Sequence, residues 1–392
     1  MTPFSEIECK CTSFFSICQR KREEIRQKWC IFVLPFQKEG AQLIMEEKKK
    51  RNILKPLLWI FGVLLLLAVG VGLYAYKAVF QPIELEETAI IYIYPDANYE
   101  DVVQMLNSEV GLPSERVFRL LAEQMNFPNM VRPGRYAIPN GMTMPDLIRM
   151  LRSGTQEPIR LTFNNIRIRE DLAGRLSQQL MLDSLSLVTA LQDPAVAERF
   201  GFTHYSFPAM FIPNTYEVFW NISVENLLNR FYREYNAFWN EDRRRKAEEI
   251  GLTPVEVSIL ASIVEAECRF SDEYSKVAGL FLNRLRRGWR LETDPTVIFA
   301  HGDFTIRRVL NRHLEIDSPF NTYRNFGLPP GPIRIPSPTA IDATLSPMQH
   351  NYMFMTANSD LSGRHLFAVT LAQHNRNARA WHQMLNERRI FR

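Results

Sequence analysis

The hydrophobic and polar positions of this chain follow several patterns, and the first is an uninterrupted apolar run. Residues 57–76 (LLWIFGVLLLLAVGVGLYAY) are twenty residues without a charge. A helix of this length crosses the hydrocarbon core of a bilayer, so we predict a transmembrane helix over residues 57–77. The basic segment KKKR at residues 48–51 precedes the run, and Glu84 with the glutamates after it follows. This bias predicts that the N-terminus lies in the cytoplasm and the rest of the chain outside.

The rival interpretations of this run are a buried core helix and a cleaved signal peptide. Uniform apolarity with aromatic ends is typical of a membrane span. The run is long for a signal peptide, and no A-x-A site follows it closely, so we predict an uncleaved anchor.

Residues 1–44 hold four of the five cysteines and lack a clear period. We interpret them either as a disordered tail or as the result of a start codon assigned too far upstream. In the second case Met45 is the first residue, and residues 45–56 are a cytoplasmic tail.

Beyond the run, short strand-like and helical patterns alternate. Residues 89–94 (AIIYIY) have the β-branched and aromatic composition of a strand. Residues 99–107 and the segment opened by Pro113 have helical spacing, and a turn–strand–turn at 132–142 precedes another helix. This order of elements predicts a small α+β module over residues 84–155.

A larger domain of mixed α and β structure is predicted over residues 156–392. Residues 159–168 (IRLTFNNIRI) have strand character. Helical spacing follows in three stretches, at residues 170–182, 183–191 and 224–250. The last stretch contains RRRK at 243–246 with glutamates just beyond it. A nucleic-acid patch is one interpretation, but a solvated helix face with local ion pairs is more typical of this pattern.

The segment 253–267 is predicted to be a capped helix. Thr253 can cap it, Pro254 suits its first position, and Glu256 can complete a capping box. At about 100° per residue, one stripe of this helix is apolar and the opposite stripe carries small residues. The small-residue stripe consists of Ser258, Ala261, Ser262 and Glu265. Neighbours too small to fill space suit a helix that lines a cleft.

The two glutamates at the end of this helix differ in their surroundings. Glu265 lies on the small-residue stripe, whereas Glu267 projects toward the apolar side, where it must either leave the helix or find a donor. A carboxyl group beside apolar walls has its acid form favoured, which is how a glutamate becomes a general acid near neutral pH. Glu265 is therefore a candidate catalytic acid, and a solvent-facing helix residue is the alternative.

The sequence after this helix adds a second helix and two polar loops. Residues 271–288 have a core face of helical spacing and end at a glycine. The loops at 289–300 and 318–333 are rich in Asn, Thr, Tyr, Asp and Pro. Neutral hydrogen-bonding and aromatic groups of this kind suit sugars, and ordered structural loops use the same residues.

Charge and cysteine content exclude several classes of function. The 392-residue chain has a net charge of +4, but residues 1–56 hold 12 Lys and Arg against 7 Asp and Glu. The remaining 35 basic and 36 acidic residues give no electrostatic argument for nucleic acid. The seven histidines lie apart from the acidic motifs without an HExxH pattern, and no CxxC is present. We therefore predict neither a metal nor a cofactor.

Five motifs stand in a fixed order in the second half of the chain. They are I-V-E-x-E, K-V-A-x-x-F-x-N-R-L-x-x-G, L-x-T-D-P-T-V-I, S-P-(F/Y)-N-T-Y and G-L-P-P-G-x-I. Here they occupy residues 263–267, 276–288, 291–298, 318–323 and 327–333. FIPNTYEV at 211–218 and HLFAVTLAQHN at 365–375 fit the same pattern. The chain in this respect resembles the endolytic murein transglycosylases of the MltG (YceG-like) family.

The resemblance implies an architecture: an anchor, a LysM-like module at residues 84–155, and a YceG-like catalytic domain at residues 156–392. It covers the chain from about Met45 onward and is densest at residues 255–335. The chain departs from the family at Pro208-Ala209, where many members carry Glu-Gly. No role is therefore carried over for that acid, nor are sugar-binding residues for the LysM-like module.

The resemblance also implies a reaction. Glu265, the first acid of I-V-E-x-E, would protonate the glycosidic oxygen between N-acetylmuramic acid and N-acetylglucosamine. Its carboxylate would then take the proton of the muramoyl C6 hydroxyl, which closes on C1 to leave a 1,6-anhydro end. Glu267 would support the site, paired with an arginine such as Arg284. Residues expected to contact substrate or support the cleft are Asn283, Asp294, Thr296, Asn321 and Tyr323, and Asp294 could equally cap a loop.

The implied role is to end the synthesis of nascent glycan strands at the outer, periplasmic side of the cytoplasmic (inner) membrane. Expected partners are the glycan strands and the penicillin-binding synthases that make them. Two alternatives stay open. One is a lysozyme-like hydrolase that uses Glu265 with Glu292 or Asp294 as a second carboxylate. The other is an inactive, membrane-anchored scaffold that binds peptidoglycan.

Overall fold

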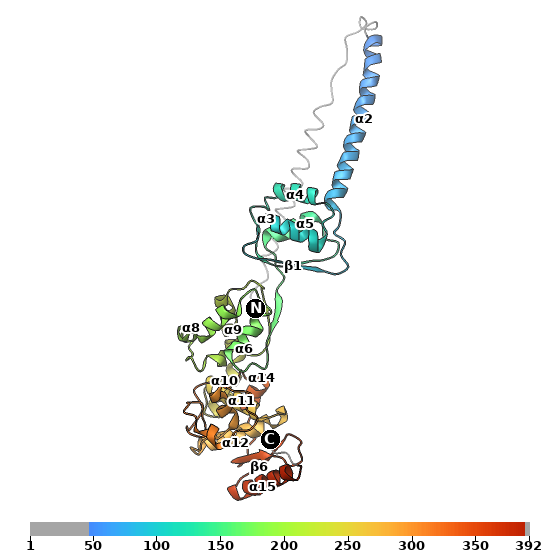
Figure 1. The fold of residues 1–392 in the computed structure, drawn as a ribbon. Helices are drawn as coiled ribbons and strands as arrows, with labels where there is room; N and C mark the ends of the chain where they lie inside the picture. Colours follow the sequence, from blue (N-terminus) through green and yellow to red (C-terminus); the bar gives the residue numbers. More distant parts are fainter. Residues whose placement is uncertain (1–46, 389–392) are drawn as a thin grey trace, which may run out of the picture. The chain divides into compact units, whose positions relative to one another are not determined.

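The structure is a computed structural model that describes residues 47–388 (Figure 1). The tail predicted at residues 1–44 lies outside the described residues. The chain divides after Lys77 into two units. Helix α2 (Glu47–Phe80) contains the predicted apolar run, and the division falls within its last turn. Its segment Pro56–Phe80 is long and apolar enough to cross a membrane, by length and composition.

The second unit begins with a small α+β arrangement around its own hydrophobic core. Its elements are β1 (Ala89–Ile93), α3 (Tyr99–Met105), the π-helical turn η1 (Leu106–Val110), α4 (Glu115–Gln124), β2 (Gly134–Ile138) and α5 (Met144–Ser153). β1 and β2 pair antiparallel, with Ala89 opposite Ile138. The three helices gather on one side of β1 (Figure 1). The predicted strands and helices of this region are confirmed, and the side chains of Ile91, Phe118 and Leu147 are fully buried in the core.

A second hydrophobic core draws on residues 161–345. The elements of this part are β3 (Ile159–Thr162), α6 (Arg169–Ser177), α7 (Ser184–Gln192), α8 (Pro194–Arg199), η2 (Phe207–Met210), β4 (Thr215–Val218), α9 (Val224–Phe238), α10 (Glu241–Glu249), α11 (Pro254–Glu267), η3 (Ser271–Glu273), α12 (Tyr274–Arg286), α13 (Asp294–His301), η4 (Asn311–Glu315), α14 (Pro338–Leu345), β5 (Phe354–Ala357), β6 (His365–Ala368) and α15 (Leu371–Glu387). β3 pairs antiparallel with β4, and β5 with β6. The described chain is therefore of mixed α and β class, as predicted.

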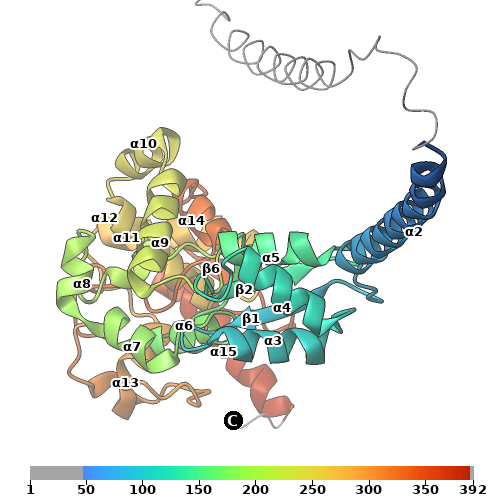
Figure 2. The same ribbon diagram turned by 90° about the horizontal axis from the view of Figure 1, so that it is seen from above.

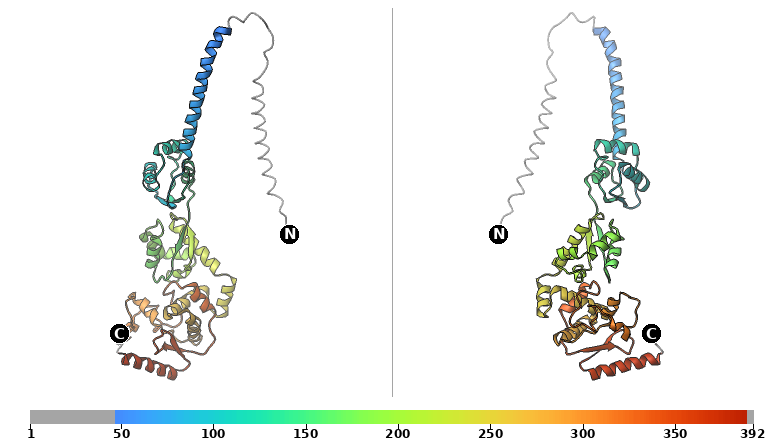
Figure 3. Two further views of the ribbon diagram at one scale, coloured as in Figure 1. Left: turned by 90° about the vertical axis from the view of Figure 1, so that its right-hand side faces the viewer. Right: turned by 60° about the vertical axis from the view of Figure 1, so that its left-hand side comes forward.

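Helix α11 lies inside this second part, among α10, α12 and α14 (Figure 2). Every side chain from Val257 to Val264 is buried. The side chains of a helix that is buried on all sides can reach a ligand only at the ends of the helix. At the C-terminal end of the chain, α15 lies along the β5–β6 hairpin (Figure 3).

Several element predictions were wrong in their bounds. The helix expected over 170–182 ends at Ser177. The helix expected over 224–250 is two helices, because Asn240 starts α10 with its side chain accepting the Arg243 N–H (3.0 Å). The strand expected over 159–168 ends at Thr162. The loop expected at 289–300 contains α13, whose second position is a proline.

The RRRK segment carries ion pairs, as predicted for a solvated helix face. Arg243 pairs with Asp342 (2.8 Å), and Lys246 pairs with Asp242 (2.7 Å). Asp242 also accepts a bond from Arg245 (2.5 Å).

Candidate functional site

The candidate site is built on the last turn of α11. The predicted start of the helix is confirmed: Thr253 Oγ1 accepts from the Glu256 N–H (3.3 Å), and Glu256 Oε2 accepts from the Thr253 N–H (2.8 Å). The helix ends at Glu267, with Cys268 extended. Glu265 and Glu267 thus occupy the last turn, where the macrodipole disfavours negative charge. A sequence that breaks a local rule in this way is typical of functional sites.

The small-residue face of α11 does not line an open cleft, contrary to the prediction. Ser258, Ala261 and Ser262 are fully buried. Ser262 Oγ donates to the Ile259 carbonyl (2.7 Å) and accepts from the Ile333 N–H (3.1 Å). Small side chains here let another stretch of backbone pass close to the helix. Only Glu265, at the end of the face, retains exposure.

Glu265 is held by one of its two carboxylate oxygens. Its Oε2 accepts from the Ser337 N–H (2.9 Å) and lies 3.6 Å from Arg334 Nε, which is ion-pair distance but too long for a hydrogen bond. Ser337 caps the start of α14, whose positive dipole end favours a nearby carboxylate. Oε1 makes no hydrogen bond to any of residues 47–388. The side chain is 13% exposed, so it is positioned but open to a ligand.

Glu267 points elsewhere and has a different partner from the one predicted. Its Oε1 accepts a hydrogen bond from Thr293 Oγ1. Burial raises the pKa of this carboxyl to about 7, against the lowering effect of the Thr293 bond. Arg284 makes no hydrogen bond to Glu267 and exerts only a weak, long-range influence on it. Glu267 therefore joins the end of α11 to the loop that starts α13.

The raised pKa of Glu267 predicts a pH-dependent stability. Because the folded chain binds this proton more tightly than the unfolded chain, the stabilising contribution is complete below about pH 4.5. It is lost as the pH rises through about 7. Glu267→Gln should therefore remove part of the fall in melting temperature between pH 5 and pH 8. Thermal unfolding of both proteins at each pH measures this, and parallel pH curves would contradict the assignment.

The side chains of Arg284 and Asn283 bond to backbone carbonyls. Arg284 is buried and donates to the carbonyls of Met353 (2.8 Å) and Leu291 (2.6 Å). Its nearest carboxylate is Glu292, at 4.0 Å. Asn283 Nδ2 donates to the His350 carbonyl (2.7 Å). Both side chains thus fix the backbone of the segments before β5 and α13.

Asp294 and Tyr323 form a pair near Glu267. Tyr323 Oη donates to Asp294 Oδ1 (2.6 Å), and burial raises the pKa of this phenol, so it stays protonated. Asp294 is the first residue of α13 and does not cap it; Thr293 takes the cap position without a side-chain bond. Asp294 is exposed and Tyr323 half-buried. This pair remains able to meet a ligand.

Thr296 and Asn321 are fully buried and fix the same two loops. Thr296 Oγ1 donates to the Thr293 carbonyl (2.7 Å) and contacts Thr322 Oγ1 (2.8 Å). Asn321 Nδ2 donates to the carbonyls of Leu314 and Ile316, each at 2.9 Å. Both side chains thus bond within these two loops.

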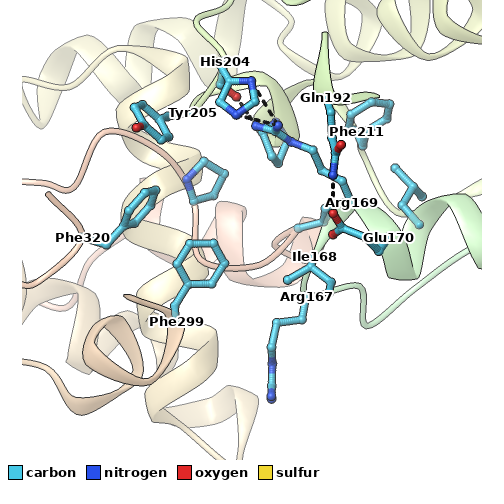
Figure 4. A pocket seen from close by; sticks show the side chains of 14 residues that line it. Arg167, Ile168, Arg169, Glu170, Gln192, His204, Tyr205, Phe211, Phe299 and Phe320 are labelled. Atoms are coloured by element: carbon cyan, nitrogen blue, oxygen red, sulfur yellow. Dashed lines mark hydrogen bonds between the residues drawn. The ribbon is translucent and has the colours of Figure 1, made fainter. Parts of the chain in front are cut away.

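Two neighbouring cavities lie beside this site. The larger, of about 530 Å³, is lined by Phe299, Phe320 and Tyr205 on one side and by Ile168 and Arg169 on the other (Figure 4). The smaller, of about 170 Å³, is lined by Ala266 and Arg334, among others. Arg167 and Phe299 line both cavities. The cavities therefore adjoin, and the smaller one reaches the neighbours of Glu265.

A sequence model described as the YceG-like family matches residues 91–380. The chain belongs to the YceG-like family. The match begins within β1 and ends within α15, so it takes in the second hydrophobic core and all buried residues of the first except Ile83.

Named relatives are similar over most of the chain. A Bacillus subtilis (strain 168) protein named endolytic murein transglycosylase is 26% identical over 341 residues, covering 81% of this chain and 92% of the relative. A Streptococcus pneumoniae (strain D39) protein of the same name is 24% identical over 358 residues, covering 80% of this chain and 63% of the relative. A crystal structure of a YceG-like protein from Listeria monocytogenes has a TM-score of 0.49 and 23% identity, covering 74% of this chain and 99% of that one.

Sequence reasoning on this YceG-like chain missed the residues that hold Glu265. Arg334 directly follows the G-L-P-P-G-x-I motif, and Ser337 opens the next helix. Nothing in their spacing indicates that they meet α11. At the departure from the family pattern, Pro208 lines the larger cavity and Ala209 is buried.

Proposed function

We propose that this chain is a membrane-anchored lytic transglycosylase that cuts within peptidoglycan glycan strands. Membership of the YceG-like family and the names of the two bacterial relatives support the class of reaction. The observation that carries the proposal is the state of Glu265. One oxygen is held by Ser337 and lies beside Arg334, and the other makes no hydrogen bond to residues 47–388.

In the proposed reaction, one carboxyl group serves first as acid and then as base. Glu265 gives its proton to the oxygen that joins C1 of N-acetylmuramic acid to N-acetylglucosamine, and that bond breaks. The carboxylate then takes the proton of the muramoyl C6 hydroxyl, whose oxygen bonds to C1. The product is a 1,6-anhydromuramoyl end, and Glu265 is protonated again. No water is consumed, which distinguishes this scheme from the two-carboxylate glycosidases.

The surroundings of Glu265 suit this exchange. After the first step the carboxylate is negative, and the Ser337 N–H and the Arg334 guanidinium stabilise that charge. Because both contacts reach Oε2, the proton can leave from and return to Oε1. Asp294 and Tyr323 are proposed to contact the glycan. Glu267, Asn283, Arg284, Thr296 and Asn321 are proposed to hold the loops around it.

The remaining parts are proposed to bring the site to its substrate. Residues 57–77 would anchor the chain in the cytoplasmic membrane, with residues 45–56 inside and the catalytic domain, residues 156–392, on the periplasmic side. The module at residues 84–155 is proposed to be LysM-like. A site held close to the bilayer would meet strands as penicillin-binding synthases release them, and would end their elongation.

Product analysis tests the proposal. The full chain in detergent micelles is incubated with uncrosslinked glycan strands, and the fragments are analysed by mass spectrometry. Internal fragments that end in 1,6-anhydromuramic acid are expected. Reducing ends would instead indicate a hydrolase that uses Glu292 or Asp294 as its second carboxylate. Absence of cleavage would indicate the scaffold.

A further inference from the structure

The larger cavity contains a cation without a carboxylate partner. Arg169, at the start of α6, is half-buried and extends toward His204 (Figure 4). Its guanidinium contacts the His204 ring at Nε2 (3.1 Å) and donates to the His204 carbonyl. Burial and the charge of Arg169 lower the pKa of His204, so the ring is neutral. Among residues 47–388, no carboxylate lies within 4.0 Å of Arg169.

The other charged groups of the cavity leave it positive. Arg167 is exposed, lies over the Phe304 ring at 4.6 Å, and also has no carboxylate within 4.0 Å among the described residues. Glu170 is the acidic residue in the lining, and its carboxylate accepts from Gln192 Nε2 (2.5 Å). Two arginines against one glutamate give a net positive lining. A partly desolvated guanidinium without a carboxylate partner favours an incoming carboxylate, which it can bind through two N–H groups.

The rest of the lining is mostly aromatic and aliphatic, and part of it belongs to the segments near Glu265. Phe299 is in α13, and Phe320 follows Ser318 in the loop that also holds Tyr323. Ile335 lies between Arg334 and Ser337, the two residues that contact Glu265. A ligand in this cavity would therefore contact the same chain segment that holds Glu265.

We propose that the cavity around Arg169 binds a carboxylate on the lactyl substituent of the muramoyl residue. This rests on the proposed function, because it takes a glycan strand as the substrate. The sugar rings of such a strand are neutral, so an uncompensated arginine contributes little to their recognition. The substituent on the lactyl group is the anionic part of the strand. It is either a short acidic peptide or, where the peptide has been removed, the lactyl carboxylate itself.

The size and lining of the cavity fit this class of ligand. About 530 Å³ lies within the range of small-molecule pockets, and it suits a short peptide segment. Aromatic and aliphatic walls suit the apolar parts of that segment, and the arginines suit its acid. The cavity would thus distinguish muramoyl residues by their substituent, whereas Glu265 cuts the bond beside them.

The test measures binding without cleavage. The full chain in detergent micelles is titrated calorimetrically with N-acetylmuramoyl-L-alanyl-D-glutamate, with its diamide, and with N-acetylmuramic acid. We expect the dicarboxylate to bind about tenfold more tightly than the diamide. Arg169→Gln should reduce that ratio to within about twofold. Arg169→Lys keeps the charge but loses the two-point contact, so it should give an intermediate ratio. Binding of N-acetylmuramic acid as tight as that of the dicarboxylate would assign the effect to the lactyl carboxylate, and weaker binding would assign it to the peptide.

Arg175→Gln is the matched control, because Arg175 is an exposed arginine of the same helix outside the cavity lining. It should keep the wild-type ratio. If Arg169→Gln lowers the melting temperature, Arg167→Gln serves as a second variant. It also removes a positive charge from the cavity lining, but at an exposed position. Equal binding of acid and diamide, or an unchanged ratio in both variants, would overturn the proposal. Cleavage by the same preparations reports on Glu265 separately, so the two proposals fail independently.

Discussion

Glu265→Gln is expected to lower kcat for cleavage of glycan strands by at least ~10³-fold. Glutamine keeps the size of the side chain, and its carbonyl can still accept from the Ser337 N–H. It has no proton to give to the glycosidic oxygen and cannot take one from the C6 hydroxyl. Because the same group is proposed to act in both steps, no other residue is expected to compensate.

The melting temperature of Glu265→Gln should stay close to that of the wild type, since the ion pair lost to Arg334 is a long one at 3.6 Å. Rates are followed by mass spectrometry of the released fragments. Glu248→Gln, at an exposed position of α10, is the matched control and should cut at the wild-type rate. A Glu265→Gln protein that cuts at more than about a tenth of that rate would assign the acid and base to other groups.

Gly331→Ala is expected to lose both stability and cleavage. A Cβ at position 331 would lie 1.9 Å from the Tyr205 carbonyl oxygen and 3.3 Å from the Ser206 nitrogen. These are backbone atoms beside η2, so no side chain can move aside. The loop must shift, and it carries Ile333, which bonds to Ser262, and Arg334, which lies beside Glu265. We expect a loss of roughly 3 kcal/mol or more in the free energy of unfolding.

Gly174→Ala separates this effect from the general consequence of replacing a glycine. Gly174 lies inside α6, and a Cβ there would meet no heavy atom within 4 Å. That substitution should stabilise the chain by roughly 0.5–1 kcal/mol, since alanine favours a helix interior. Thermal unfolding and cleavage rates measure both variants. A Gly331→Ala protein with the wild-type melting temperature would show that the loop does not pack against Tyr205 in this way.

Local patterns in the sequence were sufficient for the elements that depend on neighbouring residues. The cap of α11 could be predicted because Thr253 and Glu256 bond to each other's backbone within one turn. The apolar run in α2 could be predicted because its length and composition are properties of one segment. The motif order also indicated the family.

The sequence failed where the outcome depends on what packs against a residue. Ser258, Ala261 and Ser262 have the composition of a cleft-lining face, but the backbone at Ile333 covers it. Glu267 has Thr293 as its partner instead of Arg284, which bonds to carbonyls on two other segments. Whether a small or polar side chain faces a cavity or a neighbouring chain segment cannot be read from periodicity.

The sequence by itself determined that a capped helix ends in two glutamates and that an apolar helix precedes the folded part. The tertiary structure decided which glutamate is held by one oxygen and which is half-buried and bonded to a threonine. It also decided that Arg169 has no carboxylate partner among the described residues, in a cavity joined to the surroundings of Glu265. The physical reason is distance along the chain. Ser337 and Thr293 lie 72 and 26 positions from the glutamates they contact, and only folding brings them together.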